Sequence, residues 1–429
     1  MEALLERFNE FWRKMNKEKK FVAHEFVDFM EPAFAEAGFR KPRPQGQKAE
    51  ILIVRDDAAG DFVLFSGVIR EIRRLYPAAH ITLVVSPRSY ELAQACPYID
   101  NLELNNMQYD PDKFEDAFRY TLEFVVARLL SHHFDLSFCG RLGIRSASLL
   151  MAYMSGARER VAYTQDRVGL DGKIAHLGWD SLLTVPVPFP AEFLHDVDMN
   201  FKILEQLVRL PIANRSIEVW YTGQDVKFAA KQLAHLKKAR RRIQVLVPGA
   251  SVKRKQWPIE NYIIFLKELI SREKDLSFVV LGGKSEAGLG KKLVQEFGRK
   301  LVLNLAGKTN FRQASAVLRE AELYIGSDTG LLHIACALGL PVLTMNCFPL
   351  SLPKMQSSIP SRFYPYQVPS AVIMPAEPLD GCKDALRYGC EHENEMHCIR
   401  QIEPITVLQG YFILQKRIKE GNTKPMFLK

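Results

Sequence analysis

The chain of 429 residues has no apolar run of the length that a membrane-spanning helix needs. Apolar runs such as 278–281 and 340–345 fall far short of the roughly 20 residues of a span. The amino terminus carries a glutamate at its second position and lacks an uninterrupted apolar core, so it is not typical of a secretion signal. We therefore expect a cytoplasmic protein without a membrane span.

Cysteine is scarce, and the seven that are present are an odd number. Four of them lie in apolar or mixed contexts, where a thiol packs as a small hydrophobe: Cys96, Cys139, Cys336 and Cys347. A G-x-G-x-x-G motif is also missing, so a nicotinamide cofactor is poorly supported. With 47% hydrophobic and 25% charged residues, the composition is that of a globular protein.

Positive charge exceeds negative charge, with a formal net charge of +9. The basic residues cluster at Lys237–Arg242 and at Lys253–Lys255. Such runs can bind nucleic acid or a membrane surface, although a solvated helix end is the plainer interpretation of the first run. We expect no nucleic-acid partner. A basic cleft that binds phosphorylated small molecules lies between these two interpretations.

Apolar strands alternate with amphipathic helices in two successive series, which predicts two doubly wound parallel sheets covered by helices. We expect a helical extension and linker at 1–48, a first Rossmann-like domain at 49–215, a second at 216–380, and a Cys/His segment with a last helix at 381–429. Predicted strands are 51–54, 81–85, 102–104, 136–138, 161–163, 243–247, 278–281, 302–305, 323–326 and 342–345. Residues 348–378 are expected to be irregular.

The segment "IGSDTGLLH" places a short polar turn between a strand and an apolar helix. Asp328 or Thr329 can cap this helix, and the amides of Gly330, Leu331 and Leu332 then point out of its amino terminus. Such an end attracts phosphate, and His333 lies one turn on, on the same face as Thr329. The alternative is a capped helix with a satisfied histidine.

The segment "VPGASVKRKQWP" repeats this geometry at an earlier strand of the same series. Gly249 and Ser251 permit close approach of the backbone, and Pro258 suits the first turn of a helix. The ammonium of Lys255 could neutralise a diphosphate leaving group. The alternative is a solvated cluster of loop charges.

In "VLGGKSEAG", Glu286 follows a third strand. A carboxylate at this position can hold a ribose diol, or it can be an acid at a helix start that the helix dipole favours.

The segment "ILIVRDDAAGD" ends a strand of the first series. Gly60 permits a tight turn, and Asp61 stands at the start of a helix predicted from Phe62, where it is either a helix cap or a general base facing the other domain. The paired acids also resemble the metal-binding edge of receiver domains, although the length and the second domain argue against that interpretation.

Three cysteines and two histidines gather near the carboxyl terminus, at Cys382, Cys390, Cys398, His392 and His397. Thiolates and imidazoles this close in sequence could hold a metal, but C-x7-C-x7-C is not a familiar zinc-finger spacing. Buried thiols are the alternative, and a disulfide is less expected in a cytosolic chain.

In their order and spacing, these segments resemble glycosyltransferase family 9, the lipopolysaccharide heptosyltransferases, over about residues 50–345. The resemblance implies a GT-B fold with two Rossmann-like domains facing a cleft, and inverting transfer from a nucleotide sugar, plausibly ADP-heptose, with no metal or other cofactor required. It implies that Asp61 is the base and that Glu286 holds the ribose. It assigns the diphosphate to Lys255, Ser251, Asp328, Thr329 and Gly330, with His333 nearby.

The sequence departs from the family at Arg55–Asp57, in "MNCFPLS" after the last predicted strand, and in the helical extension. We expect a lipid-linked glycan acceptor such as a lipopolysaccharide core, with peripheral contact at the cytosolic face of the inner membrane. The amphipathic extension suits such a surface, although packing against the domains is the alternative. Other functional classes remain: a nucleotide- or glycan-binding protein without transfer, and a metal- or redox-responsive module.

Overall fold

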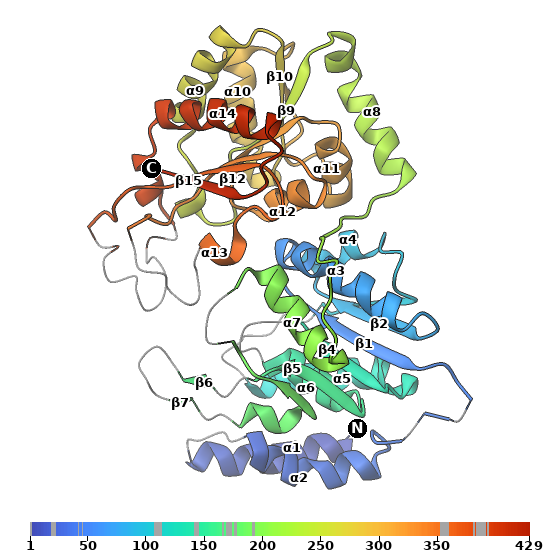
Figure 1. The fold of residues 1–429 in the computed structure, drawn as a ribbon. Helices are drawn as coiled ribbons and strands as arrows, with labels where there is room; N and C mark the ends of the chain where they lie inside the picture. Colours follow the sequence, from blue (N-terminus) through green and yellow to red (C-terminus); the bar gives the residue numbers. More distant parts are fainter. Residues whose placement is uncertain are drawn as a thin grey trace. The chain divides into compact units, whose positions relative to one another are not determined.

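The structure is a computed structural model that describes residues 2–18, 23–41, 43–44, 46–106, 114–140, 146–164, 167–168, 174–175, 178–190, 194–351, 360–380, 382, 392 and 394–429. The chain divides into two compact units (Figure 1). The first comprises Met1–Ala58, Phe65–Glu192 and Val197–Arg215, and the second comprises Ala59–Leu64, Phe193–Asp196 and Ser216–Lys429.

A six-stranded parallel sheet forms the centre of the first unit, in the order β3-β2-β1-β4-β5-β8. Its strands are mostly apolar, as is typical of a parallel sheet that helices cover on both faces. They are β1 (Glu50–Arg55), β2 (His80–Val85), β3 (Asn101–Leu104), β4 (Leu136–Cys139), β5 (Glu159–Tyr163) and β8 (Val185–Val187). The helices are α3 (Ala59–Leu75), α4 (Pro87–Ala93), α5 (Phe114–Arg128), α6 (Ser146–Met154) and α7 (Asp196–Val208), and β6 (Arg167–Val168) pairs with β7 (Ile174–Ala175).

The predicted amino-terminal helices are confirmed as α1 (Glu2–Glu18) and α2 (Ala23–Glu36). Their apolar faces are not exposed, because they pack into the core of the first unit with α5 and α6. The ring of Phe8 stacks on Phe118 at 3.6 Å between centroids, and Phe34 meets Tyr153 edge-on at 5.5 Å. Packing, the alternative to a membrane-facing role, therefore accounts for this amphipathic pattern.

The second unit contains a seven-stranded parallel sheet in the order β11-β10-β9-β12-β13-β14-β15. The strands are β9 (Arg242–Val247), β10 (Leu276–Val280), β11 (Val302–Asn304), β12 (Leu323–Ser327), β13 (Val342–Met345), β14 (Ser370–Ile373) and β15 (Pro425–Leu428). In both sheets the strand order reverses beside the first strand of the series, between β1 and β4 and between β9 and β12. The predicted fold class, two Rossmann-like doubly wound domains with a helical extension, is confirmed.

Helices cover both faces of the second sheet (Figure 1). Helices α9 (Ile259–Arg272), α10 (Ala287–Phe297) and α14 (Pro404–Lys419) share one core with β9, β12 and β13. The other layer is formed by α8 (Gly223–Lys238), α11 (Phe311–Leu318) and α12 (Gly330–Ala337). The prediction of irregular structure over 348–378 is partly wrong, since α13 (Pro360–Phe363) and the buried strand β14 lie there. None of the described helices is long and apolar enough to cross a bilayer.

Candidate active site

Two of the predicted loops meet at the point where the strand order of the second sheet reverses. In open α/β sheets, ligands bind at this point beyond the carboxyl ends of the strands. The loop after β9 carries Lys255 in the single 3-10 turn η3 (Lys253–Lys255), and the loop after β12 carries Asp328. Lys255 Nζ lies 2.9 Å from Asp328 Oδ2, so the structure joins two residues that are 73 positions apart.

The Lys255–Asp328 pair is mostly buried, with 28% and 12% of the two side chains exposed. The carboxylate of Asp328 raises the pKa of Lys255. Burial opposes ionisation of Asp328, but the Lys255 ammonium outweighs this effect and holds the pKa of Asp328 below its usual value. Both groups are therefore charged near neutral pH, and the ammonium is fixed beside the start of α12. Ser251 lies in the same loop as Lys255 and is exposed.

Among the described residues, no side chain caps the amino terminus of α12. Thr329 occupies the cap position in an extended conformation, but its side chain makes no capping hydrogen bond, and the Asp328 carboxylate is engaged with Lys255. The expectation that one of them caps the helix through its side chain is therefore wrong. Leu332 N–H donates to the Thr329 carbonyl at 3.0 Å, so this amide is not free to bind a ligand as predicted. The helix begins at Gly330. An uncapped end of this kind is suited to an anion.

His333 is buried in the first turns of α12, with 5% of its surface exposed. Burial lowers its pKa, with the Asp328 carboxylate acting in the opposite direction, so the imidazole is neutral near pH 7. Among the described residues its Nδ1 atom meets no hydrogen-bond partner. A buried ring nitrogen without a partner among the described residues is costly, so this nitrogen is available to a polar ligand.

Glu286 lies in η4 (Lys284–Glu286), after β10. Its carboxylate accepts hydrogen bonds from the Gly283 amide and the Ser285 hydroxyl, which matches the helix-start role. Its side chain also reaches across to the loop after β9, because a Cβ at Gly249 would lie only 1.9 Å from Glu286 Cγ. Gly249 is thus required for this position, a role that the motif alone did not reveal.

Asp61 lies in the first turn of α3, after β1. The helix begins at Ala59 rather than at Phe62, and Ala58 occupies the cap position, so the prediction that Asp61 caps the helix is wrong. Gly60 is helical, so the predicted tight turn is absent there. The Asp61 side chain is half-buried.

The charged residues that precede Asp61 have structural partners. Arg55 is 1% exposed and pairs with Asp57 at 3.1 Å, while Asp56 accepts a hydrogen bond from Ser148 at 2.8 Å. The guanidinium of Arg55 also lies over the ring of Phe65, 4.9 Å from its centroid. This departure from the family pattern is therefore a buried ion pair within the first unit.

The basic run Lys237–Arg242 lies at the end of α8 and the start of β9 and is partly neutralised. Lys237 pairs with Glu320, and Arg242 pairs with Glu273 and with Asp275 at 2.7 Å. Paired charges of this kind match the solvated helix end, the plainer interpretation of the run.

The carboxyl-terminal cluster is partly described. Cys382, His397 and Cys398 are buried and bring their ligand atoms together, whereas His392 pairs with Glu395 and stacks on His397 at 3.8 Å between ring centroids. Cys390 lies outside the described residues.

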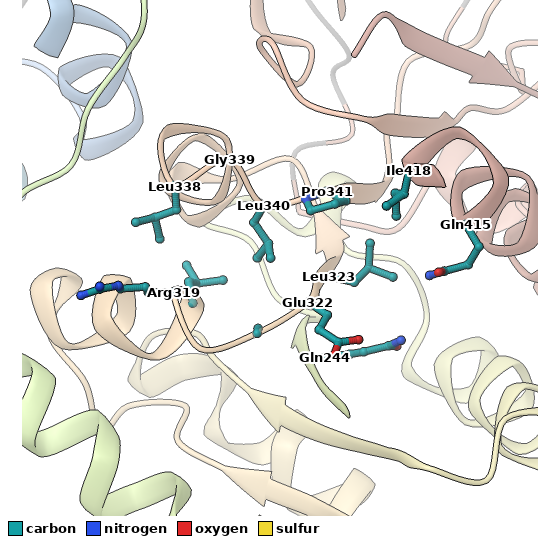
Figure 2. A pocket seen from close by; sticks show the side chains of 12 residues that line it. Gln244, Arg319, Glu322, Leu323, Leu338, Gly339, Leu340, Pro341, Gln415 and Ile418 are labelled. Carbon is teal, nitrogen blue, oxygen red and sulfur yellow. The ribbon is translucent and has the colours of Figure 1, made fainter. Parts of the chain in front are cut away.

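A pocket of about 440 Å³ lies at the other end of the second sheet, where the strands have their amino ends (Figure 2). It lies where β12 and β13 begin, between Glu322, Pro341 and Gln415. None of the predicted site residues that the structure describes lines this pocket, so it is separate from the Lys255–Asp328 pair.

Comparison with solved structures identifies the class of this fold. The crystal structure of a family 9 glycosyltransferase from Veillonella parvula matches with a TM-score of 0.65 at 16% identity, covering 86% of this chain and 97% of that one. The structure of ADP-heptose lipopolysaccharide heptosyltransferase II from Escherichia coli matches with a TM-score of 0.60 at 16% identity, covering 86% and 99%. The fold is thus the GT-B fold of glycosyltransferases.

Sequence comparison finds similarity to one family of glycosyltransferases. Residues 147–347 match the model of glycosyltransferase family 9 (heptosyltransferase). Lipooligosaccharide heptosyltransferase 2 of Haemophilus ducreyi is 23% identical over 303 residues, covering 68% of this chain and 81% of that protein. Lipopolysaccharide heptosyltransferase 3 of Escherichia coli is 25% identical over 301 residues, covering 67% and 79%. Both comparisons support the predicted resemblance to glycosyltransferase family 9.

Proposed function

We propose that the protein is an inverting heptosyltransferase that moves heptose from ADP-heptose to a lipopolysaccharide core or related lipid-linked glycan. The relatives are named for heptosyl transfer to these acceptors, which supports the sugar and the acceptor class. The observation that carries the donor site is the Lys255–Asp328 pair at 2.9 Å beside the uncapped start of α12. The acceptor would be met at the cytosolic face of the inner membrane.

In this proposal the donor diphosphate lies on the start of α12. The Lys255 ammonium neutralises charge that develops on the departing diphosphate, and the Gly330 amide and the Thr329 hydroxyl donate hydrogen bonds to its oxygens. His333 supplies its unpartnered ring nitrogen to the same ligand. Because a lysine and a helix end provide the positive charge, no metal is required for departure of the leaving group.

The acceptor hydroxyl is deprotonated by Asp61 in the proposed reaction. Its carboxylate takes the proton while the hydroxyl oxygen attacks the anomeric carbon on the face opposite the diphosphate, which inverts the configuration. Glu286 accepts hydrogen bonds from the ribose diol, after exchanging the Ser285 hydroxyl for those of the ligand.

The test is direct. Purified protein is incubated with ADP-heptose and a truncated lipopolysaccharide core, and the acceptor is analysed by mass spectrometry together with ADP release. We expect a mass gain of one heptose per acceptor, and no gain with UDP-glucose or GDP-mannose. Release of another nucleotide, or binding of ADP-heptose without transfer to any core acceptor, would contradict the proposal.

A further inference from the structure

Cys382, His397 and Cys398 form a buried cluster in the second unit that the proposed reaction does not use. The three residues are 3%, 8% and 3% exposed. Cys382 Sγ lies 3.3 Å from Cys398 Sγ and 3.2 Å from His397 Nδ1, and Cys398 Sγ lies 3.3 Å from the same nitrogen. The two sulfurs are too far apart for a disulfide bond, which is about 2.05 Å long.

The distances between these three atoms are slightly shorter than the distances between ligand atoms in a metal site. Around a tetrahedral zinc ion, with bonds of about 2.3 Å to sulfur and about 2.0 Å to nitrogen, ligand atoms lie roughly 3.5–3.8 Å apart. An ion would therefore need to separate the three atoms by only about 0.2–0.5 Å. Two thiolates and a neutral imidazole also balance the charge of a divalent ion, which suits a buried position.

Surrounding backbone groups hold the ligands in place. The Leu379 amide donates to Cys398 Sγ at 3.5 Å, which orients the sulfur within the cluster. The backbone of Asp380 hydrogen bonds to the ring of His397, as outer contacts do for metal-bound histidines. Cys382 N–H donates to the Leu379 carbonyl at 3.0 Å, which fixes the first ligand against the same turn.

We propose that Cys382, His397 and Cys398 bind one soft divalent metal ion, zinc or iron, in each chain. Sulfur and imidazole ligands select these metals over magnesium or calcium. The ion has a structural role, because it anchors the turn η5 (Cys398–Gln401) against η3, the turn that carries Lys255. The contact between them continues through Trp257, whose ring N–H donates to the Ile402 carbonyl at 2.8 Å. This site does not depend on the proposed function.

The test measures metal content and ligand identity in the full chain. Zinc and iron are counted per chain by elemental analysis after chelator washing, in the wild type, in Cys382→Ser, in Cys398→Ser and in the control Cys96→Ser. Cys96 is a buried cysteine of the first unit, so its substitution reports on the loss of a thiol elsewhere. We expect about one ion in the wild type and in the control, and at least a five-fold loss in the other two variants.

A second measurement needs no variant, which protects the test against misfolding. Cobalt is titrated into metal-stripped wild type, and thiol alkylation of Cys382 and Cys398 is followed by mass spectrometry with and without zinc. We expect a thiolate-to-cobalt absorption band that saturates at one equivalent, and alkylation of both cysteines slowed at least ten-fold by zinc. Absence of the band, metal retained in Cys398→Ser, or a disulfide between the two cysteines would overturn the proposal.

Discussion

Lys255 Nζ and Asp328 Oδ2 lie 2.9 Å apart and join the loops after β9 and β12. The two positions come from separate motifs, and their contact places one fixed positive charge where the strand order reverses. The pair gives the Lys255 ammonium a defined position, and it supports placing the donor diphosphate at this end of the sheet.

Substitution at this pair should separate stability from donor binding. In Lys255→Met the mostly buried Asp328 carboxylate loses its partner, so we expect the free energy of unfolding to fall by about 1–3 kcal/mol and ADP affinity to fall at least ten-fold. Lys255→Met/Asp328→Asn should regain most of the stability but not the affinity. Urea unfolding and calorimetry with ADP measure both quantities. Equal ADP affinity in the wild type and the double variant would contradict this role.

Gly249 controls the position of Glu286. A methyl group in Gly249→Ala would overlap Glu286 Cγ, so the carboxylate must move. We expect Gly249→Ala to weaken ADP binding about as much as Glu286→Ala does, with a smaller loss for ligands that lack a ribose diol. Gly288→Ala is the control, because a Cβ there meets no atom within 4 Å. It should leave affinity unchanged and raise stability by up to about 1 kcal/mol.

Acid should destabilise the protein through His333. Burial lowers its pKa in the folded state, so below a pH of about 6.5 the unfolded chain binds a proton that the folded chain does not. Stability therefore falls as pH falls from 7 to 5, by about 1.4 kcal/mol for each unit by which the pKa is lowered. The difference between urea midpoints at pH 7 and pH 5 should shrink in His333→Gln. An unchanged difference would show that this histidine is already protonated when folded.

The amino-terminal helices should behave as part of the core. Phe8 is 1% exposed and stacks on Phe118, so Phe8→Ala should cost about 3–5 kcal/mol of unfolding free energy. Glu10→Ala, on the exposed face of α1, should change stability by less than about 0.5 kcal/mol. Neither variant should change sedimentation with anionic vesicles. Reduced vesicle binding in Phe8→Ala at unchanged stability would support a membrane-facing helix instead.

Much of the fold could be predicted because apolar strands and amphipathic helices alternate with clear periods. The strand β13 was predicted at its observed bounds, and β1 and β9 to within one residue at each end. The start of α3 was misplaced because Ala58 and Ala59 give no capping signal. Strand β14 was missed because it is short and lies in a stretch rich in proline and serine.

The site could be predicted only as separate motifs. The residue types at Lys255, Asp328 and His333 indicated phosphate chemistry, but which charge pairs with which depends on strand order. The requirement for Gly249 is likewise invisible in the sequence, because it arises from a side chain 37 positions away. The carboxyl-terminal cluster was identified from its cysteines and histidines. The sequence could not show that Cys382, His397 and Cys398 are the members whose ligand atoms lie together, because that depends on the fold.

The most direct test of the central claim compares donor binding with turnover in Asp61→Asn. A general base contributes roughly 10²–10⁴-fold to a rate, so the account predicts that kcat for heptosyl transfer falls by that factor. The dissociation constant for ADP should stay within about two-fold of the wild type, because the proposed diphosphate ligands are unchanged. If Asp61→Asn instead retains its kcat, or loses ADP affinity in proportion to its activity, Asp61 is not the base and the proposed mechanism is wrong.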